Sequence, residues 1–331
     1  MRFRYIAVLL VLLVVATGAL YTAPANDFLF TPGHANPLAE KVRVQDARPA
    51  PGDVFYVDVF VRRETWLEQL LPFTRPEGAD VYPEHALLPS GTTEAERDRQ
   101  NAIDMEESEK IASAVALKAL GYDVKIEPVG LRVATVFSDG PSAGRLKPYD
   151  TIVAVDGKRV LTTDELRAEI GKRKPGEPVE LTVERNGKSV DVTVPTVASP
   201  ENPPRPIVGI EVGQKANIEL PIDVDIDLGD VGGPSAGLPF ALEIARMLGK
   251  NIAHGCEVAA TGELALDGTV LPIGGVKQKT IGARRTGVDV FLVPVGDNAK
   301  DARKYAGDLP VIPVNSYQQA LRKLATADLK C

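Results

Sequence analysis

The sequence predicts a multi-domain protein of mixed α+β and α/β class, with an N-terminal transmembrane helix, a β-rich middle domain and an α/β C-terminal domain. Three observations lead to this prediction. Residues 5 to 26 carry no charge, residues 124 to 197 contain short strand patterns around one helix, and strand and helix patterns alternate after residue 207. With 331 residues, the chain is long enough for two modest domains and additional segments.

The composition excludes several classes of function. A net charge of -7 and a pI near 5.2 argue against a nucleic-acid partner, which requires a basic surface. Aromatic residues make up 5% of the chain, so the cores are expected to be aliphatic. The histidines and cysteines are His34, His85, His254, Cys256 and Cys331. Their spacing is not that of metal ligands, so we expect no metal and no cofactor. Cys256 is interpreted as a small buried apolar residue.

Residues 1–25 are predicted to be a signal anchor that contacts the membrane through residues 6–25. Arg2 and Arg4 precede an aliphatic run that reaches the roughly 20 residues needed to cross a bilayer. This charge pattern places the N-terminus in the cytoplasm and the bulk of the chain outside it. The alternative is a signal peptide cleaved near Ala23-Pro24-Ala25, which would give a secreted protein.

Residues 26–123 are expected to form a juxtamembrane linker and an N-terminal strand and helix region. Proline, alanine and glycine in 24–51 predict the linker, and Val54 to Val61 has the composition of a strand. A short helix is expected over 66–71 and a polar surface segment over 74–100. The spacing of apolar residues over 105–120 predicts a longer helix that stops at Gly121.

Residues 124–198 resemble a PDZ domain. Strands are expected over 131–136, 151–155, 179–184 and 190–194, with a helix over 163–173; the resemblance is carried by Gly144 to Gly157, Pro175-Gly176 and Val179 to Val183. PDZ domains bind extended peptides, often C-terminal tails, by adding a strand to a sheet edge. By this resemblance, the peptide groove opens near Val129, Gly130, Leu131 and Arg132. The alternative is a PDZ-like fold that only packs against its neighbour.

Residues 199–206 form a proline-rich linker, and 207–331 form the C-terminal domain. In this domain, strands are expected over 207–212, 222–228, 258–261 and 290–293, and helices over 235–248, 275–285 and 298–305. This order predicts an α/β or α+β fold.

The pentapeptide Gly-Pro-Ser-Ala-Gly occurs twice, and only one copy is expected to carry a nucleophile. Ser142 lies in a turn between strands of the PDZ-like region. Ser235 follows a glycine-rich turn and opens a helix, whose N-terminal N–H groups suit a developing oxyanion. A serine that only caps this helix in a phosphate-like loop is the alternative. With Lys279 downstream, Ser235 predicts a Ser-Lys hydrolase, because a desolvated lysine can serve as a base.

Residues 207–324 resemble the proteolytic domain of Lon proteases, in particular the membrane-anchored PDZ-Lon proteins that have no ATPase domain. Four motifs carry the resemblance: 233–237, Thr261-Gly262-Glu263, 268–279 and 294–298. The Lon pattern usually has aspartate three residues before the serine, where this chain has Gly232. The resemblance implies the ribosomal protein S5 domain 2-like fold and peptide hydrolysis through an acyl-enzyme without a metal.

The resemblance also implies roles for individual residues. Ser235 is the expected nucleophile, and Lys279 is the expected general base. The Thr261 hydroxyl is expected to orient the lysine amine, and backbone N–H groups around Pro234 to Ala236, chiefly those of Gly233 and Ser235, are expected to form the oxyanion hole. A helical phase from Gly275 places Lys279 on the apolar, inward face and Lys277 toward solvent.

We therefore expect an ATP-independent, membrane-anchored serine endopeptidase that acts on extracytoplasmic proteins or peptides. The chain has no Gly-x-x-x-x-Gly-Lys-[Ser/Thr] motif. The PDZ domain is expected either to select substrates by their C-terminal tails or to gate the active site, and a homo-oligomer is expected from the Lon resemblance. The alternative is a PDZ peptide-binding membrane scaffold with an inactive Lon-like domain.

Overall fold

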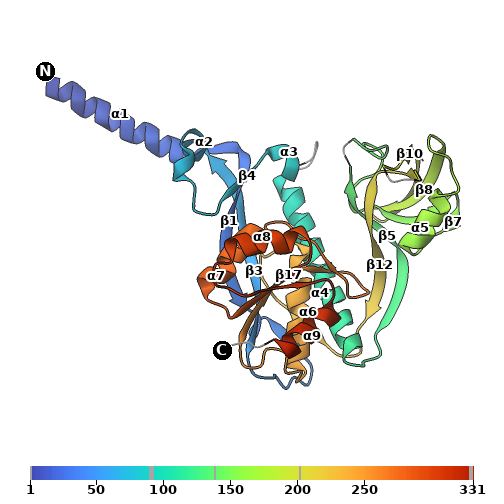
Figure 1. The fold of residues 1–331 in the computed structure, drawn as a ribbon. Helices are drawn as coiled ribbons and strands as arrows, with labels where there is room; N and C mark the ends of the chain where they lie inside the picture. Colours follow the sequence, from blue (N-terminus) through green and yellow to red (C-terminus); the bar gives the residue numbers. More distant parts are fainter. Residues whose placement is uncertain (1, 89–92, 138, 201–202, 328–330) are drawn as a thin grey trace. The chain divides into compact units, whose positions relative to one another are not determined.

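The computed structural model describes residues 2–88, 93–137, 139–200, 203–327 and 331. These residues form two compact units (Figure 1). The first, which we call the discontinuous unit, combines Met1–Tyr122 with Ile222–Cys331, and the second, the inserted unit, comprises Asp123–Pro221. The mixed α/β, multi-domain class predicted from the sequence is confirmed.

The discontinuous unit begins with α1, Arg2–Thr22, whose segment Arg4–Thr22 is long and apolar enough to cross a membrane. A signal sequence near an N-terminus would meet the same criterion. The rest of the unit is built on a sheet with the strand order β18-β17-β14-β3-β1-β4. These strands are β1 Pro24–Pro37, β3 Asp53–Thr65, β4 Asp80–Tyr82, β14 Glu257–Ala260, β17 Val290–Pro294 and β18 Val311–Val314.

The two faces of this sheet carry different helices because successive strand residues point to opposite sides. One face packs Phe55, Val57, Ala259 and Phe291 against α7 and α8, and the other packs against α6. A long helix, α4, lies against α6. The helical segments are α2 Trp66–Leu70, η1 Pro72–Thr74, α3 Glu84–Leu87, α4 Glu94–Ala119, η2 Pro234–Ala236, α6 Gly237–Met247, α7 Val276–Thr286, α8 Asp297–Tyr305 and α9 Tyr317–Thr326.

Two short strand pairs complete the unit: β2 Val42–Val44 with β13 Val224–Ile226, and β15 Glu263–Leu264 with β16 Val270–Leu271. The segment predicted as a linker over 24–51 therefore contains β1, which pairs with β3 along most of its length. Pro32 lies at an irregularity in this pairing, which is where a strand tolerates proline. The polar segment over 74–100 holds β4, α3 and the start of α4, while its residues 89–92 lie outside the described part.

The inserted unit is a sheet with the order β12-β5-β6-β8-β9, in which β7 also pairs with β6. Its core is aliphatic and includes Leu131, Ile152 and Leu181. The elements are β5 Lys125–Val136, β6 Thr151–Val155, β7 Lys158–Arg159, α5 Thr163–Ile170, β8 Pro178–Arg185, β9 Lys188–Pro195, β10 Val197–Ala198, β11 Pro206–Ile207 and β12 Ile210–Glu219.

The predicted boundaries divide the chain differently from these units. The region 26–123 supplies β1 and β3 to the same sheet as β14 and β17, rather than forming a separate segment. At the other boundary, the strand expected at the start of 207–331 is β12, which pairs with β5 of the inserted unit. The linker predicted over 199–206 is bordered by the β10 and β11 pair, with 201–202 outside the described residues.

Candidate active site

Ser235 and Lys279 meet in the discontinuous unit although 44 residues separate them in the chain. Ser235 lies in η2, directly before α6, and Lys279 lies in the first turn of α7. The distance between Lys279 Nζ and Ser235 Oγ is 3.1 Å. A nucleophile and its base must lie within hydrogen-bond reach, and this pair meets that requirement.

The surroundings of Lys279 favour its neutral form. The side chain is 7% exposed, and its amine donates to the backbone carbonyl of Val57 in β3. Burial lowers the pKa of Lys279 to about 8, while the nearby charge of Asp58 acts in the opposite direction. A neutral amine has one lone pair and two N–H bonds. With one N–H on Val57, the lone pair is available to take the Ser235 hydroxyl proton.

Asp58 was not anticipated from the sequence. Its carboxylate accepts hydrogen bonds from the backbone N–H of His34 at 2.6 Å and from the Asn36 side chain at 3.0 Å. A Cβ at position 33 would lie 1.8 Å from Asp58 Oδ1, so Gly33 is required for this close approach. These donors fix the negative charge that counteracts the desolvation of Lys279.

Thr261 holds the backbone of the nucleophile. Its hydroxyl donates to the carbonyl of Ser235 at 3.1 Å, and Gly262 N–H donates to the same oxygen at 2.9 Å. The expected hydrogen bond from Thr261 to the lysine amine is therefore replaced by one to Ser235. The reason is that Thr261, one residue beyond the end of β14, faces the turn that precedes α6.

The oxyanion donors also differ from the expectation. Gly233 has φ 94°, which favours glycine, but its N–H donates to the carbonyl of Asn101 at 2.8 Å. Pro234 has no N–H. Ser235 N–H remains as a candidate donor, because it lies in the first turn of a helical segment, where N–H groups lack a partner within the helix. Ala236 is buried in the same turn.

Helix α4 supports the loop that carries Ser235. The Ser108 hydroxyl donates to the carbonyl of Pro234 at 3.1 Å, in addition to the hydrogen bond from Gly233 to Asn101. A Cβ at position 232 would lie 2.7 Å from Asn101 Cβ, so the packing of α4 leaves no room for the aspartate of the usual Lon pattern. The sequence alone gave no signal for Asn101 or Ser108, because both act across elements.

The other Gly-Pro-Ser-Ala-Gly copy, which contains Ser142, and the neighbouring lysine, Lys277, do not contribute to the Ser235 and Lys279 pair. Ser142 is fully buried in the inserted unit, where its hydroxyl donates to the carbonyl of Val208 at 2.6 Å. Its role is structural. Lys277 points away from Ser235 and forms an ion pair with Asp80 at 2.7 Å. Lys279 is buried, as the helical phase predicts, whereas Lys277, which is expected to face solvent, is partly buried with its side chain 23% exposed.

The predicted peptide groove near Val129, Gly130, Leu131 and Arg132 lies on β5, which is an interior strand of the sheet. Leu131 and Arg132 pair with β12 on one side and with β6 on the other, so their backbone edges are occupied. In the described part of the sheet, the edge strands are β12 and β9. The helix α5 contacts β12, and the Gln214 side chain of β12 donates to Leu161 O at 3.4 Å. The edge available beside a helix is therefore that of β12.

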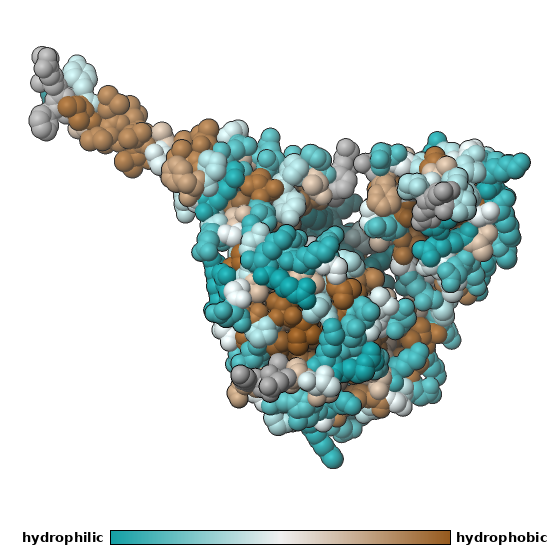
Figure 2. All heavy atoms as spheres, in the orientation of Figure 1, coloured by the Kyte–Doolittle hydropathy of each residue, from teal (hydrophilic) through white to brown (hydrophobic). Residues whose placement is uncertain are grey.

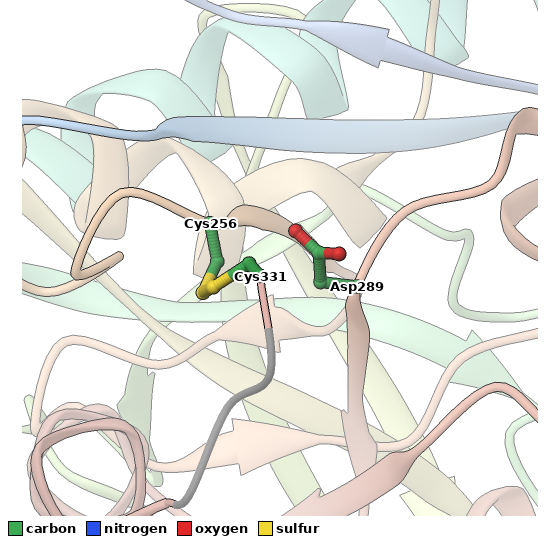
Figure 3. A group of neighbouring side chains, drawn as sticks. All are labelled: Cys256, Asp289 and Cys331. Atoms are coloured by element: carbon green, nitrogen blue, oxygen red, sulfur yellow. A yellow bond between two sulfur atoms is a disulfide. The ribbon is translucent and has the colours of Figure 1, made fainter.

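Cys256 is buried, as predicted, but it forms a disulfide with Cys331 (Figure 3). Their Cα atoms lie 5.4 Å apart and the residues are 75 positions apart in the chain, which is why spacing gave no sign of the pair. Asp289 lies beside them, and together these residues are the one candidate metal-binding group among the described residues. Because the two sulfurs are bonded to each other, they are not available as thiolate ligands.

Comparison with known proteins identifies two domains. The Lon protease (S16) C-terminal proteolytic domain matches residues 208–326, and a PDZ domain matches residues 103–196. The Lon protease of Desulforamulus reducens is 42% identical over 93 residues, which cover 28% of this chain and 10% of that protein. The mitochondrial Lon protease homolog of Drosophila melanogaster is 47% identical over 70 residues, which cover 21% of this chain and 6% of that protein.

The chain thus spans about a tenth or less of the length of these relatives. Among solved structures, the PDZ domain of the SdrC-like protein from Listeria innocua is 25% identical and has a TM-score of 0.24. The alignment covers 25% of this chain and 92% of that domain. The residues matched by the proteolytic domain, 208–326, include both Ser235 and Lys279.

Proposed function

We propose that this chain, which carries a Lon-type proteolytic domain and a PDZ domain, is a serine endopeptidase with Ser235 as nucleophile and Lys279 as general base. The observation that carries this proposal is the 3.1 Å contact between Ser235 Oγ and the amine of a buried lysine. Such a lysine replaces the histidine of other serine hydrolases, because burial brings its pKa into the range of a useful base.

The proposed reaction proceeds through an acyl-enzyme. Neutral Lys279 takes the Ser235 hydroxyl proton while Oγ bonds to the carbonyl carbon of the scissile peptide. The resulting oxyanion is stabilised by Ser235 N–H and by the positive end of α6. As the C–N bond breaks, the Lys279 ammonium returns the proton to the leaving amine. Water then attacks the ester by the same proton transfers, releasing the acid and restoring Ser235.

The test uses the two Gly-Pro-Ser-Ala-Gly serines as a matched pair. We expect Ser235→Ala to abolish casein hydrolysis and labelling by a fluorophosphonate probe. Ser142→Thr retains a hydroxyl to donate to Val208 and should retain both activities. An unlabelled wild-type protein that still binds peptides would instead indicate a PDZ scaffold with an inactive Lon-like domain.

We further propose that hydrolysis is independent of ATP and that the substrates are unfolded or loosely folded proteins. This proposal is supported by the absence of a phosphate-binding Walker motif from the sequence. Casein hydrolysis at equal rates with and without ATP and Mg²⁺ is the expected result. Dependence of the rate on ATP would contradict it.

The PDZ domain is proposed to bind C-terminal tails along the free edge of β12, next to α5. Support comes from the position of β12 at the edge of the sheet and from the strand-addition mode of PDZ domains. Peptides with a free hydrophobic C-terminus should shift the NMR signals of β12 in the full-length chain. The same peptides with an amidated C-terminus are the matched control. A change in casein hydrolysis on adding the free peptides would distinguish gating from tail selection.

We propose that α1 anchors the protein with its N-terminus in the cytoplasm and the two units outside. The length and composition of α1 support this placement, and the disulfide between Cys256 and Cys331 suits an oxidising compartment. A C-terminally tagged protein should stay in membranes after a salt wash and be degraded by externally added protease. A soluble product that lacks residues 1–25 would show cleavage instead.

A further inference from the structure

Four large apolar side chains within residues 66–73, just after β3, are exposed. They are Trp66, Leu70, Leu71 and Phe73, with exposures of 44%, 61%, 40% and 82%. We call these four residues the juxtamembrane patch. Together they belong to α2, η1 and the residue between them. Contiguous exposed apolar side chains of this size generally mark a surface that another apolar phase covers.

Helix α2 has the reverse of the orientation expected in water. Its acidic residue, Glu68, is 7% exposed, whereas Trp66 and Leu70 face outward. Glu68 completes a capping box with Thr65 and forms an ion pair with Arg62 at 2.5 Å. The Arg62 guanidinium lowers the pKa of Glu68 to about 2, so this carboxylate stays charged and bonded on the inner side. The helix is therefore fixed with its apolar side chains outward.

The patch is tied directly to the end of α1. Trp66 N–H donates to the carbonyl of Ala23 at 3.1 Å, one residue beyond Thr22, where the apolar segment ends. This segment of 19 residues is about 28 Å long, close to the hydrocarbon thickness of a bilayer. In Figure 2 the apolar colouring of α1 continues onto the surface at the base of this helix, where Figure 1 labels α2. The patch therefore lies next to the C-terminal end of α1.

The cations around the patch are neutralised by acidic partners. Arg62 pairs with Glu68, Arg75 pairs with Glu64 at 2.6 Å, and Arg63 pairs with Glu84 at 2.9 Å and with Glu94 at 2.5 Å. Paired charges attract anionic headgroups weakly, so an interaction of this surface with lipid should depend on its apolar area.

We propose that the juxtamembrane patch inserts into the headgroup and acyl boundary of the leaflet from which α1 emerges, so that the discontinuous unit is held against the bilayer. The occupant of the patch is lipid, because its backbone is bonded to the residue that follows the membrane helix. Tryptophan suits this depth, since its ring is apolar and its indole N–H can face the headgroups. The proposal rests on α1 being retained as the proposed anchor.

The single tryptophan of the chain provides the test. Full-length protein is reconstituted into phosphatidylcholine vesicles that contain lipids brominated at shallow or deep acyl positions. We expect Trp66 fluorescence to be quenched at least twofold more by shallow bromines than by aqueous acrylamide. The quenching by bromolipid should not change in 1 M NaCl. Stronger quenching by acrylamide than by bromolipid overturns the proposal. Shielding from both quenchers that depends on the protein-to-lipid ratio indicates a second copy and also overturns it.

Variants separate the patch from the anchor. Leu70→Ser with Phe73→Ser should reduce bromolipid quenching of Trp66 by at least half, whereas Phe137→Ser, an exposed aromatic of the inserted unit, should leave it unchanged. Unchanged quenching in the double variant contradicts the proposal. Extraction by carbonate and the N-terminal mass of the protein report on whether α1 is retained. Cleavage near Ala23-Pro24-Ala25 overturns both the anchor and the patch, whereas a retained α1 with a water-exposed Trp66 overturns the patch alone. Casein hydrolysis in the same vesicles reports on Ser235 independently.

Discussion

The environment of the Lys279 amine determines how the proposed reaction depends on pH. Its pKa of about 8 leaves the amine mostly protonated at pH 7, and only the neutral form can accept the Ser235 proton. We expect kcat/KM to rise about tenfold per pH unit below pH 8 and to level off above it. The measurement is hydrolysis of a fluorogenic peptide from pH 6 to 9.5. A flat profile over this range would contradict Lys279 as the base.

Burial of the Lys279 amine should lower the free energy of unfolding. Its pKa is lower in the folded protein than the ordinary value of 10.5, so the unfolded chain binds more protons between about pH 8 and 10.5. Stability should therefore rise with pH through that window, and the cost should be fully present below pH 8.

Replacing the buried amine should consequently stabilise the fold. The lowering of the Lys279 pKa from 10.5 to about 8 corresponds to a loss of about 3 kcal/mol in the free energy of unfolding. Removing the amine recovers this loss but also removes the hydrogen bond to Val57, which costs about 1–2 kcal/mol. Lys279→Met is expected to abolish turnover and to raise the free energy of unfolding by about 1–2 kcal/mol at pH 7 in urea titrations. Lys277→Met is the matched control: it loses its ion pair with Asp80, and should keep most activity without gaining stability. A less stable Lys279→Met protein would contradict this account.

The sequence could identify a site residue where its role depends on one element alone, and not where it depends on contacts between elements. The choice of Lys279 over Lys277 follows from the helical phase, a property of one element. The partners of Gly233 and Thr261 could not be predicted in this way. Gly233 N–H meets Asn101 of α4, and the Thr261 hydroxyl meets the Ser235 carbonyl, so both contacts depend on how separate elements pack.

At the scale of elements, α4 should control the geometry of the Ser235 loop through Gly232. A methyl group at this position would lie 2.7 Å from Asn101 Cβ and 3.1 Å from the Asn101 carbonyl carbon, so α4 or the loop must move. Gly232→Ala should cost about 1–3 kcal/mol of stability and lower kcat/KM at least tenfold, because the loop carries the nucleophile. Gly18→Ala in α1 is the control, since no atom lies within 4 Å of its added Cβ and it lies outside the proposed catalytic and peptide-binding sites. Equal kinetics in the two variants would show that α4 does not position Ser235.

The elements with clear periodicity were predicted best. The strands β6, β8, β9 and β17 and the helix α7 lie within a few residues of their expected ranges. The sequence predicts a linker where β1 lies, because Pro24, Pro32 and Pro37 obscure the strand pattern. Pairing with β3 stabilises β1 despite these prolines. The sequence places the peptide-binding edge on β5 because β12, the strand that pairs with this edge, begins only at Ile210, outside the region that resembles a PDZ domain.

At the scale of the whole molecule, the inserted unit interrupts the discontinuous unit in sequence. The chain builds β1, β3 and α4 first, then residues 123–221, and then returns with β13, η2 and α6. Changes in composition along the chain predict domain boundaries that assign β12 to the C-terminal domain and separate β3 from it. Only strand pairing between distant segments shows that β3 lies beside β14.

The Cys256–Cys331 disulfide connects the last residue of the chain to the sheet, and it makes the redox state of the protein a test of where the protein resides. It should persist only outside the reducing cytoplasm. Protein isolated from membranes with alkylating agent present should show no free thiol, and two after reduction.

Cys331→Ser should lower the free energy of unfolding by about 2–4 kcal/mol. The variant should retain casein hydrolysis at low temperature, because Cys256 precedes β14 whereas Thr261, which holds Ser235, follows its other end. Two alkylated cysteines in the unreduced native protein would contradict the proposed extracytoplasmic location, even if the peptidase activity of Ser235 were intact.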